Sequence, residues 1–261
     1  MKRPIDALPG WWRDERAAVG STNDEAMDWF RNGDSGQLWV TGTEQKTGKG
    51  RRNRAWHSPP GNLYASLLLV DPAPMQSMSM MPLLAVLALN DAVASLAPLL
   101  QDRLLIKWPN DLLLDGGKLA GILLEGSNRT SGEQGVVVGF GVNCEHAPQE
   151  ALYPTATLAG SGAAIASEAL FTALATAVAK RLVQWQQGQA PAAIRRDWLS
   201  RATGLNRTIT VRFADHEKTG IFRDIASDGQ LVLERPDGST ELVSAADVFL
   251  HSPNNEVPVT I

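Results

Sequence analysis

The sequence predicts an α+β fold in two domains, a larger one over residues 1–204 and a small β-barrel over residues 205–252. Strand-forming segments and apolar helical stretches follow one another through the first domain, and the chain then changes to short alternating strands. The change falls at Gly204–Asn206, where turn-forming residues interrupt the helical pattern. With 261 residues the chain can bury a full core without disulfide bonds.

The first predicted helix begins near Ser21-Thr22-Asn23. Thr22 followed three residues later by Glu25 is typical of a capping box, and the residues after it supply an apolar face. Gly33 is expected to end this helix.

The elements after this helix form a run of strands interrupted by one apolar helix. Strands are predicted at 38–40, 62–70, 104–108, 111–114, 118–125 and 136–142, and the apolar helix at about 79–100. Asp115-Gly116-Gly117 is expected to form a hairpin turn.

Two helices, at about 163–187 and 190–202, complete the first domain. In the second, Asp228-Gly229 and Asp237-Gly238 mark turns between short strands, which is the pattern of a small barrel. Residues 253–261 contain two prolines and are expected to be a flexible tail.

Composition indicates a cytoplasmic protein. The single cysteine, Cys144, has no partner in the chain, and the N-terminus lacks the apolar stretch of a secretory signal. The longest apolar run is broken by Asn90-Asp91, so we expect a buried helix and no membrane partner. A net charge of −4 gives no general attraction to nucleic acid, so anion binding must be local.

Positive charge is clustered in the segment from Gln45 to Trp56. Glycines there let backbone amides approach a ligand, and the guanidinium groups can bind carboxylate or phosphate in bidentate fashion. This composition suits a phosphoanhydride. For an isolated stretch, a solvated basic turn or a nucleic-acid patch is an equal alternative.

A second segment, Leu104–Asp111, places Lys107 on a strand of otherwise apolar residues. Because side chains alternate along a strand, Lys107 lies on the face opposite to that of Ile106 and Trp108. Pro109 ends the strand, so Asn110 and Asp111 lie just beyond its end. This arrangement predicts an anion site. A charged edge strand that resists aggregation is the alternative.

A third segment, Val138–Cys144, carries glycines that permit close backbone approach and ends in an amide, Asn143, able to read a base edge. Other familiar patterns fail. Gly48-x-Gly50 lacks the third glycine of a dinucleotide loop, no Walker motif is present, and scattered histidines with one cysteine predict no metal site in the protein.

In this order the segments closely resemble the biotin-protein ligases. The matching residues are Ser21-Thr22-Asn23, the Gln45–Trp56 loop, Lys107–Asp111, Lys118–Ile122 and Gly139–Asn143. The resemblance implies a mixed β-sheet flanked by helices, similar to class II aminoacyl-tRNA synthetases, with a small C-terminal β-barrel.

The resemblance also implies roles for individual residues. The implied biotin contacts are Ser21, Thr22, Asn23, Gln45, Lys49, Gly50, Arg51 and Lys107. The implied ATP contacts are Arg54, Trp56, Asn110, Lys118 and Asn143. Lys107 and Arg51 are the implied catalytic residues. The family commonly has arginine where this chain has Lys49, and glycine where it has Asn53.

The activity implied is ATP-dependent formation of biotinyl-5′-AMP, then transfer of biotin to a lysine of a biotin carboxyl carrier protein. The cationic side chains would neutralise two anions that repel each other, and Mg²⁺ would shield the pyrophosphate. A mobile basic loop that orders on ligand binding is also expected.

Two other functions compete with this one: a lipoate-protein ligase on the same scaffold, and a non-catalytic biotin sensor. Some family members carry an N-terminal DNA-binding domain. Fewer than 25 residues precede Ser21-Thr22-Asn23 here, so we expect no operator binding. A homodimer is left open.

Overall fold

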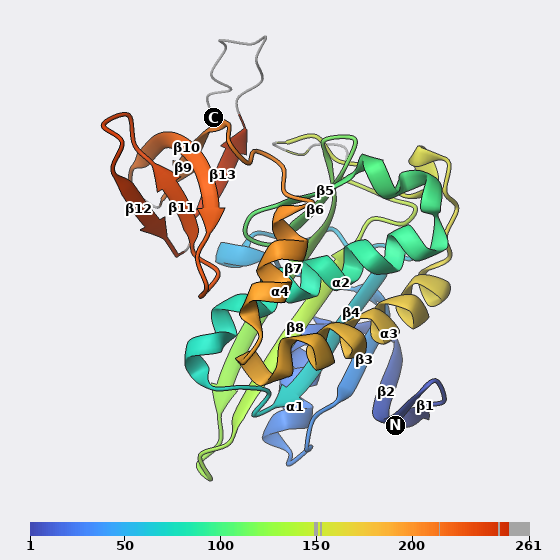
Figure 1. Cartoon of the computed structure of the whole chain (residues 1–261). Coiled ribbons are helices and arrows are strands. Elements are labelled where there is room, and N and C mark those ends of the chain that lie inside the picture. Colours follow the sequence, from blue (N-terminus) through green and yellow to red (C-terminus); the bar gives the residue numbers. More distant parts are fainter. Residues whose placement is uncertain (149–150, 152, 214, 245, 251–261) are drawn as a thin grey trace.

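The computed structural model describes residues 1–148, 151, 153–213, 215–244 and 246–250. Its strands form two sheets (Figure 1). The larger has eight strands in the order β1-β2-β3-β4-β8-β7-β6-β5. Only β2 and β3 pair in parallel and the other neighbours are antiparallel, so the predicted mixed sheet is confirmed.

The strands of the larger sheet are β1 (Arg3–Ile5), β2 (Leu8–Val19), β3 (Leu38–Gln45), β4 (Leu63–Val70), β5 (Leu104–Lys107), β6 (Asp111–Leu114), β7 (Gly117–Asn128) and β8 (Gln134–Val142). The helices are α1 (Thr22–Arg31), α2 (Met81–Leu96), α3 (Ser167–Trp185) and α4 (Pro191–Leu199), with short 3₁₀ turns at Arg51–Asn53, Met75–Met80, Pro98–Arg103, Ala159–Ser161 and Gln186–Gly188.

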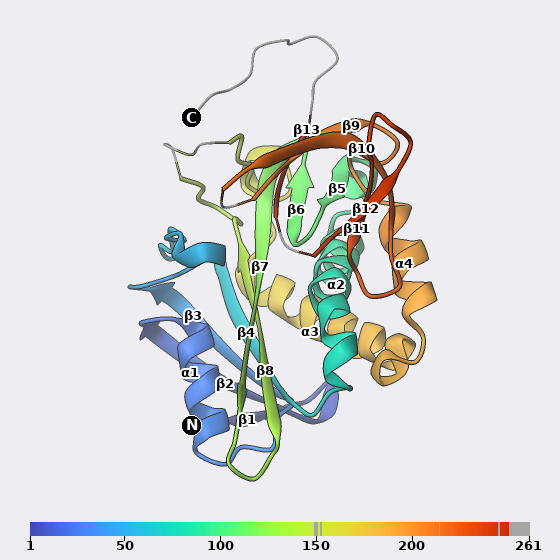
Figure 2. The ribbon, with the colours of Figure 1, turned by 90° about the vertical axis from the view of Figure 1, so that its left-hand side faces the viewer.

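Helices cover both faces of this sheet. Figure 2 shows α1 on one face and α2 and α3 on the other. The α1 face packs a small cluster around Phe30, Val40 and Leu68, while the main core lies between the sheet and α2. The stretch Met75–Leu96 is long and apolar enough to span a membrane, yet most of it is buried in the fold, as in a core helix.

The smaller sheet is antiparallel and comprises β9 (Thr208–Arg212), β10 (Glu217–Ile225), β11 (Leu231–Glu234), β12 (Thr240–Val243) and β13 (Asp247–Leu250), in the order β12-β11-β10-β9-β13. Among the described residues β12 and β13 stand at opposite ends of this order, so closure into a barrel stays a prediction. Its inner residues, such as Val211 and Phe222, belong to the main core.

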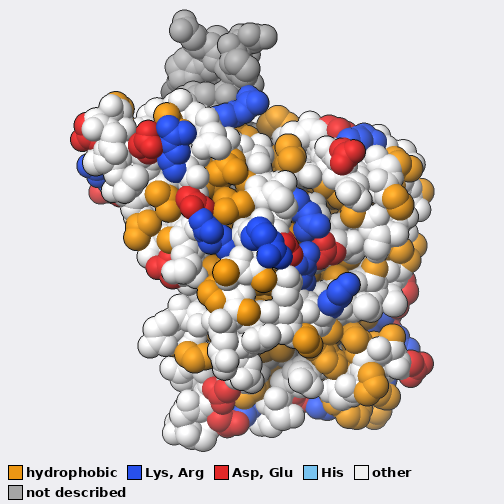
Figure 3. Space-filling view, viewed as in Figure 1, with side chains coloured by type: hydrophobic (Ala, Val, Ile, Leu, Met, Phe, Trp, Pro, Cys, Tyr) orange, Lys and Arg blue, Asp and Glu red, His pale blue; other side chains and the backbone are white. Residues whose placement is uncertain are grey.

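The helical face of the molecule carries a group of Lys and Arg side chains interspersed with Asp and Glu (Figure 3). Ion pairs also link three helices: Arg181 of α3 contacts Asp91 of α2 and Asp197 of α4, and Arg201, just after α4, contacts Asp91. The charges of these two arginines are therefore balanced by the two carboxylates.

The structure corrects two details of the sequence interpretation. Strands β1 and β2 precede α1, although charged residues such as Arg13, Asp14 and Glu15 hide the strand pattern. The capping box is wrong: Ser21 is the N-cap, it makes no side-chain cap bond, and Thr22 is already helical. The predicted tail, 253–261, lies outside the described residues.

Candidate active site

Three glycines on one face of β8 let other groups lie directly on the strand. Gly135, Gly139 and Gly141 alternate with Val136, Val138 and Phe140, whose side chains enter the main core on the opposite face. A Cβ at Gly135 would collide with the Phe30 ring, and one at Gly139 would overlap Asn23 Oδ1. A Cβ at Gly141 would lie 2.6 Å from the Trp56 ring. The glycines therefore bring α1 and Trp56 onto the sheet.

Polar side chains form a network where β3 ends beside the start of α1. Gln45 Oε1 accepts hydrogen bonds from Thr22 N at 2.8 Å and from Thr22 Oγ1 at 3.0 Å. Gln45 Nε2 donates to Ser58 Oγ at 3.0 Å, and Ser66 Oγ lies 2.6 Å from Asn23 Oδ1. We call these five residues the polar cluster. Thr22, Asn23, Ser58 and Ser66 are buried, so the network is held in place by its own bonds.

A carboxylate and an ammonium close one side of the polar cluster. Asn23 Nδ2 donates to Glu125 Oε2 at 2.7 Å. Lys49 Nζ lies 2.8 Å from Asp24 Oδ1 and 3.3 Å from Glu125 Oε1. The hydrogen bond from Lys49 to Asp24 raises the pKa of Lys49 above its ordinary value. Lys49 thus fastens the basic loop, residues 46–54, to α1 and β7.

Two lysines meet at one carboxylate on the neighbouring strands. Asp111, the first residue of β6, lies 3.3 Å from Lys107 Nζ through Oδ2 and 2.8 Å from Lys118 Nζ through Oδ1. We call these three residues the cationic cluster. The Asp111 side chain is only 12% exposed, and the two lysines are partly exposed. One net positive charge therefore faces the site.

A β-bulge places Lys118 on this face. Between Leu112 and Leu113 the register of β6 against β7 shifts by one residue, so that Leu112 pairs with Ala120 but Leu113 pairs with Lys118. In a regular strand Lys118 and Gly121 would face opposite sides of the sheet. Here a Cβ at Gly121 would lie 3.3 Å from Lys118 Nζ, which puts both on one side.

The charge state of Asp111 follows from its surroundings. Burial by itself raises the pKa of this carboxyl, but the ammonium groups of Lys118 and Lys107 outweigh that effect and hold the pKa below its ordinary value. Asp111 is therefore ionised at neutral pH. It orients the side chains of Lys107 and Lys118, and both ammonium groups can also bind an anionic ligand.

The basic loop spans the distance between the two clusters. Lys49 contacts the polar side, while Arg51 Nη1 lies 3.4 Å from Asn110 Oδ1 beside the cationic cluster. The loop has its own backbone bonds, Gly50 N to Arg54 O at 2.7 Å and Trp56 N to Gly48 O at 2.9 Å. Burial lowers the pKa of Arg51. Lys49 and Arg51 of this loop thus connect the polar cluster to the cationic cluster.

Two aromatic rings flank Lys118. Its Nζ lies 5.4 Å from the centroid of Trp56 and 5.4 Å from that of Tyr153. The Trp56 ring lies against the paired glycines Gly121 and Gly141, in direct contact with the sheet. An aromatic ring beside a cationic cluster suits a nucleotide.

Two of the amides in the predicted ATP site serve the fold in this structure. Asn143 is 2% exposed, and its Nδ2 donates to Lys118 O at 3.2 Å. Asn110 Nδ2 donates to Ile122 O, while its Oδ1 faces Arg51. Base recognition by Asn143 stays a prediction.

The structure brings the predicted residues together. Thr22, Asn23 and Gln45 belong to the polar cluster, which Lys49 contacts through Glu125, and the buried Ser21 precedes it as the N-cap of α1. Lys107, Lys118, Asn110, Arg51 and Trp56 lie around Asp111. Arg54 is the exception, because its guanidinium contacts Asp247 of the smaller sheet.

Sequence reasoning missed four partners in the site: Ser58, Ser66, Glu125 and Asp247. Ser66 and Glu125 lie on predicted strands, and their polar side chains in apolar segments were the available signal. Asp247 lies about 200 residues from the loop that it contacts, and no local pattern reports such a contact.

The described residues contain no group of three His, Cys, Asp or Glu side chains able to hold a metal ion. Asp111 is the buried carboxylate of the site, and two lysines already engage it. Such a site fits a Mg²⁺ ion carried chiefly by phosphate oxygens and water, and does not fit a dedicated protein cage.

Known protein families match both parts of the chain. Residues 17–143 match the biotin/lipoate A/B protein ligase family, and residues 204–251 match the biotin protein ligase C-terminal domain. The fold is similar to that of a biotin protein ligase from Aquifex aeolicus solved with biotin and ATP, with a TM-score of 0.78, 20% identity and coverage of 92% of this chain and 99% of the other.

Two sequence relatives are more similar to this chain. The biotin--[acetyl-CoA-carboxylase] ligase of Paracoccus denitrificans is 41% identical over 240 residues, which cover 89% of this chain and 98% of the relative. That of Mycobacterium tuberculosis is 32% identical over 251 residues, covering 94% and 91%. Together with the two family models, these matches show that the chain belongs to the biotin protein ligase family.

Proposed function

We propose that this protein is a biotin-protein ligase. It activates biotin with ATP to form biotinyl-5′-AMP and pyrophosphate, then transfers biotin to a lysine of a biotin carboxyl carrier protein. The observation that carries the proposal is the continuity of the site: a neutral hydrogen-bonding cluster lies at one end of the basic loop, and two lysines around Asp111 lie at the other.

The polar cluster suits the uncharged cyclic urea of biotin. The carbonyl oxygen of the urea accepts hydrogen bonds and the two urea N–H groups donate them. A buried binding site for this ring must therefore offer both donors and acceptors. Thr22, Gln45 and Ser66 offer hydroxyl and amide groups that can exchange their mutual bonds for bonds to this ring. Biotin then points its carboxylate along the loop toward Lys107 and Lys118.

In the first step a carboxylate oxygen of biotin attacks the α-phosphorus of ATP. The bond from this phosphorus to the bridging oxygen of pyrophosphate breaks, and pyrophosphate leaves. Lys107, Lys118 and Arg51 neutralise the two anions that must meet, and Trp56 offers a surface for the adenine. Mg²⁺, when bound with the nucleotide, shields the leaving pyrophosphate.

In the second step the amine nitrogen of the carrier lysine attacks the carbonyl carbon of the mixed anhydride. An amide bond forms, the bond between the carbonyl carbon and the bridging phosphate oxygen breaks, AMP leaves with that oxygen, and the amine proton passes to solvent. Cations that remain beside the phosphate stabilise AMP as the leaving group. We also propose that the enzyme works in the cytoplasm and binds neither nucleic acid nor a membrane.

Exchange of radiolabelled pyrophosphate into ATP tests the first step. We expect exchange that depends on biotin, and transfer of biotin to a carrier domain in a second assay. Lipoate supplied in place of biotin should support neither reaction. Exchange with lipoate alone would make the protein a lipoate ligase, and biotin binding without exchange would make it a sensor.

A further inference from the structure

Three arginines of the basic loop converge on one carboxylate of the smaller sheet. Arg54 Nη2 lies 3.0 Å from Asp247 Oδ1 and 2.9 Å from Oδ2. Arg52 Nη1 lies 3.2 Å from Oδ2, and Arg51 Nη1 lies 3.9 Å from Oδ1. Arg51 also donates to the carbonyl of Ala246 at 3.3 Å. Asp247 thus binds the loop much as a phosphate group would.

The backbone of the loop supports this convergence. Arg52 and Asn53 both have φ of 56°, in the left-handed region that residues other than glycine seldom adopt. Asparagine tolerates this region better than most residues, which suits Asn53 to this turn. The turn directs Arg51, Arg52 and Arg54 toward Asp247, which is 21% exposed.

The charges around Asp247 do not balance. Three guanidinium groups face one carboxylate, so two positive charges are left over. A triphosphate or pyrophosphate carries more negative charge and more acceptor oxygens than a carboxylate, so it competes effectively for the same donors. Where Asp247 and a phosphate share donors, each weakens the binding of the other.

We propose that Asp247 sets the affinity of the enzyme for its nucleotide by occupying the loop arginines until phosphate displaces it. The inference rests on the proposed function, because it takes the arginines as phosphate ligands. The apparent dissociation constant for nucleotide is then the intrinsic constant divided by the fraction of molecules in which the arginines are free. Removing the carboxylate should tighten nucleotide binding.

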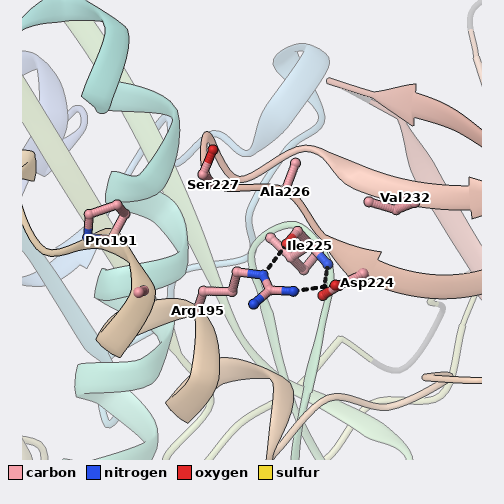
Figure 4. A pocket seen from close by; sticks show the side chains of 8 residues that line it. Pro191, Arg195, Asp224, Ile225, Ala226, Ser227 and Val232 are labelled. Carbon is pink, nitrogen blue, oxygen red and sulfur yellow. Dashed lines mark hydrogen bonds and ion pairs between the residues drawn. The ribbon is translucent and has the colours of Figure 1, made fainter.

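Other contacts attach the smaller sheet to the rest of the protein when the ion pairs between Asp247 and the loop arginines break. A pocket of about 260 Å³ lies between α4 and the smaller sheet. In it Arg195 donates to Asp224 and to the carbonyl of Ile225 (Figure 4). Trp108 Nε1 donates to Gly229 O at 3.0 Å. The sheet therefore stays attached without Asp247, and its substitution is expected to leave the fold intact.

The test compares Asp247→Asn with Glu241→Gln. Glu241 lies on β12 of the same sheet and pairs with Lys218 and Arg235, so its substitution removes the same charge away from the loop. In biotin-dependent pyrophosphate exchange at saturating biotin, Asp247→Asn should lower KM for ATP about tenfold, the size expected from three partly exposed ion pairs. Calorimetry with inorganic pyrophosphate should show the same tightening, and Glu241→Gln should change neither.

The sign of the effect decides the inference. A KM for ATP that rises or stays unchanged in Asp247→Asn would show that the carboxylate supports the arginines or is irrelevant to them. An equal fall in Glu241→Gln would assign the effect to net charge and also overturn the inference. Absence of exchange in the wild-type protein is a separate result, which refutes the proposed function.

A measurement on the wild-type protein covers the case in which Asp247→Asn fails to fold. Hydrogen exchange of residues 246–250 is followed with and without biotin and MgATP. Displacement of Asp247 predicts faster exchange in this segment together with slower exchange in residues 49–54. Slower or unchanged exchange at 246–250 contradicts displacement.

Discussion

The two ends of the active site hold their side chains in different ways. In the polar cluster, neutral groups satisfy one another: Gln45 accepts from Thr22 and donates to Ser58, and Ser66 lies between Thr22 and Asn23. In the cationic cluster, like charges that would repel are held together by Asp111.

This difference assigns recognition of biotin to the polar cluster and acceleration of the chemical step to the cationic cluster. A neutral network exchanges its bonds for equivalent bonds to a ligand, so it contributes to binding in the ground state and the transition state alike. Cations directed at a phosphate act most strongly where negative charge develops, which is the transition state. Substitutions in the polar cluster should therefore change KM for biotin, and substitutions in the cationic cluster should change kcat.

The largest effect is expected from Lys107→Ala. Loss of an ammonium at the reacting centre should lower kcat for pyrophosphate exchange by about a hundred- to a thousandfold, the range for one lost electrostatic contact to a transition state. KM for biotin should change much less than kcat, because Lys118 and Arg51 remain to bind the carboxylate. Steady-state kinetics with biotin and with ATP varied in turn measures both.

Lys180→Ala serves as the control, because Lys180 is an exposed residue of α3 on the opposite side of the sheet. It should behave as the wild type. Near-normal biotinylation by Lys107→Ala, or a rise in KM for biotin with kcat unchanged, would contradict the assignment of substrate recognition to the polar cluster and of catalytic rate to the cationic cluster.

The next effect concerns the aromatic surface beside the cations. Gly141→Ala places a methyl group 2.6 Å from the Trp56 ring, so the ring must leave its position on the sheet. Stacking of a base on an aromatic side chain contributes about 1–3 kcal/mol, so KM for ATP should rise about ten- to a hundredfold.

The matched control is Gly126→Ala on β7, where the nearest atom would be 3.7 Å away, an ordinary contact. It should leave KM for ATP unchanged. Equal values in the two variants would show that Trp56 does not face the nucleotide.

Asp111→Asn tests how the cationic cluster is held. Two ammonium groups lose their shared carboxylate, but both are partly exposed, so we expect a loss of about 1–2 kcal/mol in the free energy of unfolding, below the 3–5 kcal/mol typical of a broken buried pair. The pKa of Asp111 is lowered in the folded protein, so its stabilisation is present above its ordinary pKa and is lost as pH falls through the folded value.

Chemical unfolding of wild type and Asp111→Asn at pH 7 and near pH 3 measures the change in the free energy of unfolding and its dependence on pH. The difference between wild type and Asp111→Asn should be full at pH 7 and should shrink at the acid end. A difference that stays constant across this range would mean that ionisation of Asp111 does not hold the lysines.

The sequence predicted the two clusters unequally. Lys107 was found because a cation in an apolar strand is conspicuous, and Thr22 with Gln45 came from the family resemblance. The bulge that turns Lys118 toward Asp111 was not predicted, since Lys118-Leu-Ala-Gly has no local mark of a register shift. Asp247 was missed because its partners are brought to it by the packing of two sheets, and β2 was missed because its charged residues suppress the strand signal.

The smallest effect is expected at the neutral end, from Thr22→Val. The substitution keeps the shape of the side chain but removes the hydroxyl, which donates to Gln45 Oε1 and can accept from Ser66 Oγ. The bond from the Thr22 backbone N–H remains, and Ser66 keeps Asn23 Oδ1 as its acceptor. One neutral hydrogen bond contributes about 0.5–1.5 kcal/mol, so KM for biotin should rise about three- to tenfold with kcat unchanged. Thr172→Val, whose hydroxyl bonds only within α3 as far as the described residues show, makes the same chemical change away from the site and should have no effect. A fall in kcat with KM for biotin unaffected would place Thr22 at the reacting centre and remove the reason for treating the two ends as different.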